Sequence, residues 1–236
     1  MDVSAIASLT KPILCVDTCT LLDIMRDPTR DTARAHERQA AIDLVELAET
    51  GKLTCLIAEQ VKTEFHEHDQ AIQNEAETKL KKLSEQIRRV GDIAAVFGSP
   101  QTLDLTHLHE HVPKARKVVQ RWLDQLQTVA PGDDAHRRAF ARVNSNRAPA
   151  RRGKESSKDC LVYETYLETM SLIRAQGFAS KMVFVSSNTA DYCDNRTVLK
   201  SEIATEFGGL SIDYAPNMAA AKYALGFTNS RQKQKA

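Results

Sequence analysis

PILCVDTCTLLDIM, residues 12–25, decides the fold: an apolar run, an aspartate, and then the start of a leucine-rich segment. The run 12–16 is short, apolar and partly β-branched, which predicts a strand buried on both faces, as in a parallel sheet. Thr18 and Thr20 suit a turn from strand to helix. Asp17 therefore ends the strand, at the sheet edge where open parallel sheets bind ligands.

The same alternation of strand and helix returns on both sides of a long middle stretch. Further strands are predicted at 53–58, 181–186 and 210–215. Helices are predicted at 32–50, 59–90, 159–176 and 197–207, with Gly51, Gly91 and Gly177 as the stops of the first three. Strands that alternate with helices in this way indicate an α/β fold, a parallel sheet with helices on both faces.

The middle of the chain interrupts this alternation. Residues 93–140 look helical throughout, apart from breaks at prolines. We therefore predict a single domain over residues 1–236 that carries an inserted helical lobe at 92–150.

Composition indicates a folded protein but does not by itself identify its function. The chain has 236 residues, is 42% hydrophobic and has a net charge of +1, which suits one domain with a sizeable core and says nothing about partners. No apolar run approaches membrane-spanning length, and the N-terminus lacks a signal peptide's features. The five cysteines include no CxxC pair, so we expect free thiols in a reducing, cytoplasmic setting and no membrane.

Four acidic residues stand after strand ends or early in helices: Asp17, Glu64, Asp159 and Asp191. Taken singly, Asp17 and Asp159 could cap helices. Glu64 could be a solvated helix residue and Asp191 a turn former. Magnesium and manganese take oxygen ligands, and carboxylates that meet at strand ends can hold them. The joint placement of the four acids therefore predicts one metal site.

A basic segment leads up to Asp159. Between 137 and 154 the chain contains seven basic residues and no acid: Arg137, Arg138, Arg142, Arg147, Arg151, Arg152 and Lys154. Contacts of arginine and lysine with phosphates dominate affinity for nucleic acids. We predict that a nucleic acid is bound by Arg142, Arg147, Arg151, Arg152 and Lys154. The alternatives are a solvated basic loop and a contact with an acidic partner protein.

Four segments resemble, in order, the motifs of the PIN-domain nucleases. The first two are ILCVDTCTLLDI (13–24) and VKTEFHEH (61–68). The last two are GKESSKDCLVYETYL (153–167) and VFVSSNTADYCD (183–194). Together the resemblance covers residues 12–67 and 153–215, and it resembles a subgroup with a large lobe between the second and third motifs.

The resemblance implies a fold, an activity and a set of site residues. The fold is an α/β/α sandwich of PIN type, and the activity is a metal-dependent endoribonuclease that leaves 5′-phosphate and 3′-hydroxyl ends. Magnesium or manganese would be held by Asp17, Glu64, Asp159, Asp191 and Asn188, the four acids being catalytic. Thr18 and Ser186 match hydroxyl positions that orient the carboxylates. RNA is expected over DNA, and relatives include toxins held by an antitoxin and homodimers.

Two other interpretations stay open. Phosphatases of the haloacid-dehalogenase type also begin with a strand and an aspartate, but they need a second aspartate where this chain has Cys19. A nucleic-acid-binding or scaffold protein with an incomplete metal site is the other, because many relatives have an aspartate where Asn188 stands. Asp191 then either supplies the missing acid or packs behind Asn188.

Overall fold

The structure, a computed structural model, describes residues 6, 8, 10–99, 104–195 and 198–227. Its centre is a five-stranded sheet in the order β3-β2-β1-β4-β7. All of the pairings in this sheet are parallel. The strands are β1 (Ile13–Val16), β2 (Thr54–Ala58), β3 (Leu126–Val129), β4 (Met182–Val185) and β7 (Ile212–Ala215). The predicted α/β class is confirmed.

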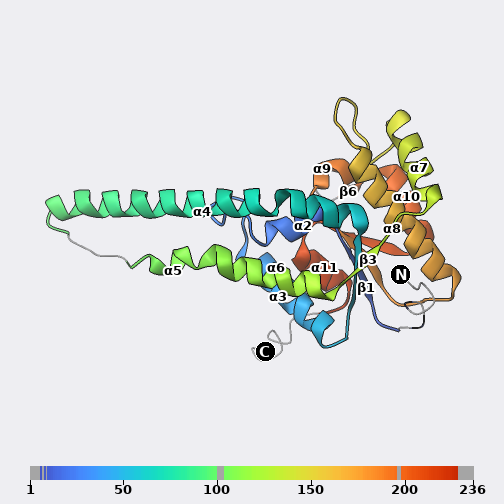
Figure 1. Cartoon of the computed structure of the whole chain (residues 1–236), viewed down its shortest axis with the longest axis horizontal. Helices are drawn as coiled ribbons and strands as arrows, with labels where there is room; N and C mark the ends of the chain where they lie inside the picture. Colours follow the sequence, from blue (N-terminus) through green and yellow to red (C-terminus); the bar gives the residue numbers. More distant parts are fainter. Residues whose placement is uncertain (1–5, 7, 9, 100–103, 196–197, 228–236) are drawn as a thin grey trace.

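Helices cover both faces of this sheet (Figure 1). On one side α3 (Ala35–Glu49) packs against α6 (His111–Gln125) and α11 (Met218–Ala224). On the other side α8 (Ser157–Ala175) packs against α7 (Asp133–Asn144) and α10 (Ser201–Leu210). Two short helices follow strand ends, α2 (Thr18–Asp23) after β1 and α9 (Thr189–Tyr192) after β4.

Strand β1 lies at the middle of the sheet, and all four of its side chains are fully buried. The run of apolar residues with no polar alternation is what a strand covered on both faces requires. From β1 the chain builds β2 and β3 on one side, and later β4 and β7 on the other. The strand order therefore reverses between β1 and β4, which places a ligand crevice at the carboxyl ends of these two strands.

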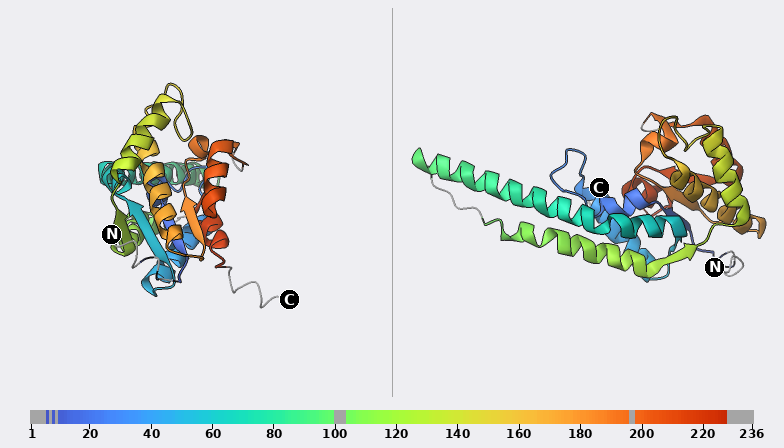
Figure 2. Two further views of the ribbon diagram at one scale, coloured as in Figure 1. Left: turned by 90° about the vertical axis from the view of Figure 1, so that its right-hand side faces the viewer. Right: turned by 45° about the horizontal axis from the view of Figure 1, so that its top comes forward.

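A long helical arm projects from the sheet (Figure 1 and Figure 2). Helix α4 (Glu59–Val96) has 38 residues and packs against α5 (Thr106–His109) and α6. The predicted stop at Gly91 is wrong, because the helix continues past it to Val96. The backbone turns to the left-handed region only at Gly98, whose φ is +83°, and a glycine ends a helix where the chain takes that conformation.

Several short strands and helices were not predicted from the sequence. Strand β3 falls inside the stretch expected to be helical. It is an edge strand, and only its last side chain is buried. Its four residues therefore show no clear alternation of apolar and polar side chains. The segment predicted to open a helix at 197 instead contains β6 (Val198–Leu199), which pairs with β5 (Cys193–Asn195) before α10 begins. Helix α11 was not predicted.

All five cysteines lie within the described residues and are free thiols, as predicted. Four of them are buried, and Cys19 is half-buried. Among the residues that the structure describes, no helix has both the length and the apolar character needed to cross a bilayer.

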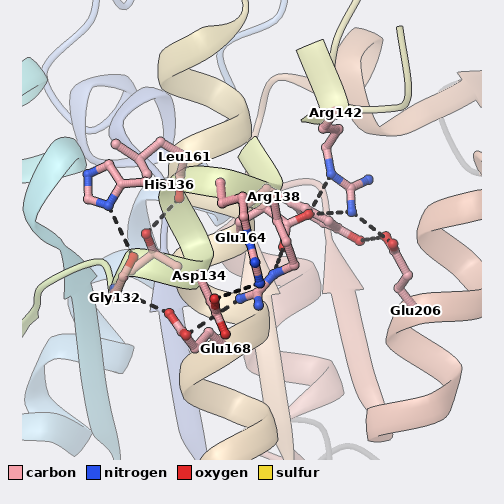
Figure 3. A network of polar contacts seen from close by, with 12 residues as sticks. Gly132, Asp134, His136, Arg138, Arg142, Leu161, Glu164, Glu168 and Glu206 are labelled. Carbon is pink, nitrogen blue, oxygen red and sulfur yellow. Dashed lines mark hydrogen bonds and ion pairs between the residues drawn. The ribbon is translucent and has the colours of Figure 1, made fainter. Parts of the chain in front are cut away.

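Arg142, which we expected to contact a nucleic acid, lies in the interior between α7 and α8 (Figure 3). Its side chain is 3% exposed and bonds Glu164, itself 4% exposed, with the Nη2 and Oε1 atoms 2.6 Å apart. The same guanidinium reaches Glu206 at 2.8 Å and donates to the carbonyl of Ala148. Arg138 donates to the second oxygen of Glu164 at 2.9 Å. Arg142 therefore joins three segments of the fold.

Replacing Arg142 should destabilise the protein strongly. Arg142→Ala leaves the buried carboxylate of Glu164 with only one cationic partner, and removing one member of a buried ion pair costs about 3–5 kcal/mol. Urea unfolding followed by circular dichroism measures this loss. Arg137→Ala in the same helix is the matched control, because Arg137 is 77% exposed and its pair with Asp134 contributes about 0.5 kcal/mol. Equal losses in the two variants would contradict the structural role.

Candidate active site

Asp17 is fixed in the crevice between β1 and β4. Its backbone N–H donates to the carbonyl of Val185 at 3.0 Å, which extends the parallel pairing by one residue beyond β1. Its side chain caps α2 by accepting from the Thr18 N–H at 2.7 Å. The buried hydroxyl of Ser186, which follows β4, donates to its other carboxylate oxygen at 2.6 Å. Asp17 is thus both the predicted helix cap and a buried acid at the crevice.

Tyr166 on α8 ties that helix to the ends of the strands. Its hydroxyl donates to the carbonyl of Val16 at 2.7 Å and accepts from the N–H of Ala58 at 2.9 Å. The hydroxyl thereby satisfies two backbone groups at the carboxyl ends of β1 and β2. We did not single out Tyr166 from the sequence, although a buried tyrosine needs a partner for its hydroxyl.

Glu64 and Asp159 approach the crevice from two helices. Glu64 is the sixth residue of α4, and its Oε2 accepts from the hydroxyl of Thr18 at 2.9 Å. Asp159 is the third residue of α8, where a negative charge favours the helix N-terminus. Thr18, predicted to orient a carboxylate, therefore binds both acids: its hydroxyl donates to Glu64 and its N–H donates to Asp17.

The pKa values show that these acids share one electrostatic environment. Burial raises the pKa of Asp17 to about 6; the charge of Asp159 adds to the rise, and hydrogen bonds from Ser186 and Cys19 oppose it. Burial also raises the pKa of Asp159, with the charges of Asp191 and Glu64 adding to the rise against Lys154. The structure therefore gathers negative charge at the carboxyl edge of the sheet.

Asp191 is held differently from the other acids. It is 0% exposed, and its Oδ2 accepts from Lys154 Nζ and from Asn188 Nδ2, each at 2.5 Å. Arg151 Nη1 reaches its Oδ1 at 3.4 Å. In the structure Asp191 packs against Asn188 and is bound to the basic loop, and its role as a metal ligand stays a prediction.

The five predicted nucleic-acid contacts divide into two groups. Arg142 and Arg147 bond Glu206 on α10, Arg147 at 2.5 Å. Arg151 and Lys154 face Asp191, and Arg152 between them is exposed. Only the second group, in the loop before α8, lies beside the carboxylates.

A groove of about 770 Å³ is lined by Cys19 and Asn188, which lie close to Asp17 in the sequence or in the crevice, and by the segment after α2; the four acids themselves are not part of its lining. Four arginines line it at intervals of four residues: Arg26, Arg30, Arg34 and Arg38. Arg38 donates to the carbonyls of Ile24 and Arg26 and so holds this segment in place. Arg30 and Arg34 are exposed. The spacing of these arginines is visible in the sequence, but we did not single it out.

The donor chemistry of the site fits a hard divalent cation. Asp17, Glu64 and Asp159 offer carboxylate oxygens, the ligands that magnesium and manganese prefer, and their mutual repulsion would be relieved by an ion. Within the described ranges, however, no three His, Cys, Asp or Glu side chains form a group ready to hold a metal. The three acids would therefore hold an ion only after drawing closer together.

Comparison with known proteins gives one match. The family model described as PIN domain matches residues 14–192, a span that contains every predicted metal-binding residue. No curated protein and no solved structure matches the chain.

The buried charge of Asp17 should cost stability at neutral pH. The folded-state pKa of about 6 lies above the ordinary value of 3.8, so the folded chain binds the proton more tightly and loses stability as pH rises through this interval. The full loss is on the order of 3 kcal/mol. In EDTA at pH 7.5, Asp17→Asn should therefore be more stable than the wild type in urea unfolding, and this difference should vanish near pH 4.

Asp213→Asn on β7 serves as the control, because Asp213 is exposed. It should show no such pH-dependent gain. An Asp17→Asn variant that is less stable than the wild type at pH 7.5 would contradict the assigned charge penalty.

Proposed function

The chain belongs to the PIN-domain family, whose members are typically nucleases, and on that premise we propose that it is a metal-dependent endoribonuclease. One observation carries this proposal: Asp17, Glu64 and Asp159, which are far apart in the sequence, reach one crevice, where burial and the charge of Asp159 raise the pKa of Asp17. Concentrated negative charge lowers the stability of the folded protein, and destabilising charge of this kind is typical of functional sites. The reaction would be hydrolysis of a phosphodiester to 5′-phosphate and 3′-hydroxyl ends.

In this proposal Asp17, Glu64 and Asp159 hold the cation and the neighbouring hydroxyls orient them. A bound magnesium or manganese ion would lower the pKa of a water molecule and stabilise charge on the phosphate oxygens. Ser186 fixes one oxygen of Asp17, and Thr18 fixes Glu64. Cys19 donates to Asp17 at 3.2 Å, and its pKa is raised by burial, so it acts as a donor to the carboxylate rather than as a nucleophile.

The path proposed for the substrate combines the groove and the basic loop. The groove reaches Cys19 and Asn188 beside the crevice, and its exposed Arg30 would contact phosphates. Arg34 is also exposed, but its Nη1 donates to the carbonyls of Asp31 and Ala33. Arg152 lies in the loop on the Asp191 side. Cationic side chains of this kind bind a backbone without reading its sequence. RNA as the substrate, an antitoxin-type partner and a homodimer stay predictions from the family resemblance.

Asp17→Asn should abolish cleavage of single-stranded RNA in the presence of magnesium or manganese. The substitution removes a ligand charge while keeping the shape of the side chain, so activity should fall at least about 100-fold, as removal of a group that stabilises transition-state charge does. Gel assays of an end-labelled oligonucleotide, with single-stranded DNA in parallel, measure the rate and the nature of the substrate.

Asp213→Asn should cleave like the wild type. If the wild type bound RNA but cleaved neither RNA nor DNA with either metal, the chain would instead be a nucleic-acid-binding protein with an incomplete site.

Arg152→Ala should weaken binding of single-stranded RNA and make it less sensitive to salt. Each phosphate contact that is lost reduces the slope of log K against log salt concentration by about 0.7 for a single strand. Fluorescence anisotropy at several salt concentrations measures this slope. Lys52→Ala is the control, because Lys52 is exposed and precedes β2, at the opposite edge of the sheet. Equal slopes in the wild type and Arg152→Ala would exclude the loop from the interface.

A further inference from the structure

The outer segment of α4, residues 83–97, extends beyond the helices that pack against the rest of it. In both views α4 continues past the beginning of α5, toward the free end of the arm (Figure 1 and Figure 2). The buried cluster inside the arm contains Ala76, Leu80 and Val112, and Leu108 packs against it. Beyond Leu80, the described residues of the arm include four large apolar side chains that are more than half exposed: Val90, Ile93, Val96 and Phe97. Apolar side chains gathered on a surface in this way mark an interaction site.

The apolar positions of the outer segment continue the pattern by which α4 packs inside the arm. From Leu80 outward, apolar residues recur at alternating steps of three and four residues: Leu83, Ile87, Val90, Ala94 and Phe97. At 3.6 residues per turn this spacing keeps them on one side of the helix, which is the pattern of helices that pack along their length. The face that packs against α5 and α6 at Ala76 and Leu80 therefore continues into the outer segment.

The charged residues of the outer segment lie on the other side of the helix. There are two acids and two bases, all exposed: Glu85, Arg88, Arg89 and Asp92. The residues that border the apolar face at the helical spacing are uncharged, namely Ser84, Gln86 and Gly91. A helix that binds a lipid surface has a strongly basic polar face, and an acidic partner would likewise require cations at the border. This face therefore fits an apolar helix with an uncharged border.

We propose that the outer segment of α4 pairs with the outer segment of a second copy of the chain, with the two helices antiparallel. The same face on a second copy has the required chemistry, and its uncharged border brings no like charges together across a two-fold axis. A parallel pair would bring α5 and α6 of both copies into the space between the two α4 helices, because they pack on the same face farther down the arm. Antiparallel pairing avoids this overlap.

The antiparallel arrangement defines which residues meet. Full overlap of residues 83–97 places Val90, the middle residue, at the two-fold axis and Leu83 opposite Phe97 of the second copy. Glu64 lies 26 residues before Val90, which is about 40 Å along the helix at 1.5 Å per residue. The two crevices would therefore lie far from the interface and from each other. Pairing of the arms is for this reason independent of the proposed nuclease activity.

The oligomeric state of the full chain tests the proposal. Size-exclusion chromatography with light scattering, over a range of protein concentrations, should show a dimer of the wild type. Val90→Glu should weaken dimerisation by at least about 100-fold, because two glutamates would face each other at the axis. Circular dichroism should show that this variant keeps its helix content, since Val90 is exposed in the single chain. Tyr223→Glu is the matched control, because Tyr223 is an exposed large side chain on α11, outside the arm, and this variant should remain a dimer.

Cross-linking tests the orientation of the two helices. Under mild oxidation Val90→Cys should form a disulfide between two copies, because the two residues at position 90 meet at the axis. Leu83→Cys should not, because Leu83 faces Phe97 of the second copy in the antiparallel pair. The wild type is the blank for the native thiols, of which four are buried and Cys19 is half-buried.

Four results would overturn the inference. The first is a wild type that stays monomeric at every concentration. A dimer that Val90→Glu leaves intact, or one that Tyr223→Glu disrupts as strongly, would place the interface elsewhere. Leu83→Cys that cross-links as readily as Val90→Cys would contradict the antiparallel pairing. None of these results depends on cleavage of RNA, so failure of this inference and failure of the proposed function are distinguishable.

Discussion

The buried carboxylate of Asp17 is the constraint on which the rest of the structure depends. Parallel pairing of β1 with β4 continues through its N–H, and the side chain accepts from both Thr18 and Ser186. These bonds satisfy the carboxylate only partly, because burial still raises its pKa to about 6. The fold therefore keeps a negative charge that it would be more stable without, which is typical of a functional site.

The basic residues between 137 and 154, before α8, make two different kinds of contact. Arg142 and Arg147 bond Glu206 and so join α7 to α10, whereas Arg151 and Lys154 turn to the opposite side and meet Asp191. One continuous run of positive charge thus divides between holding the fold together and balancing the acids of the site. The net charge of the segment could not predict this division, because the division depends on which acidic side chain each cation contacts in the fold.

The local sequence pattern was enough to predict the centre of the sheet. A wholly apolar strand followed by Asp17 predicts both the β1 position and the ligand edge, since these follow from burial and from the topology of parallel sheets. The interior position of Arg142 could not be predicted, because its partners Glu164 and Glu206 lie 22 and 64 residues further along the chain. The edge strand β3 was missed because only four residues, mostly unburied, define it. The predicted lobe boundaries at 92–150 stay a prediction.

The central claim is that Asp17, Glu64 and Asp159 hold a divalent ion that the reaction requires. A crystal structure of the protein soaked in manganese, with anomalous scattering recorded near the manganese edge, tests it most directly. The account predicts an anomalous peak within about 2.5 Å of oxygens from all three acids. Three carboxylates that stay apart with no peak between them would contradict it.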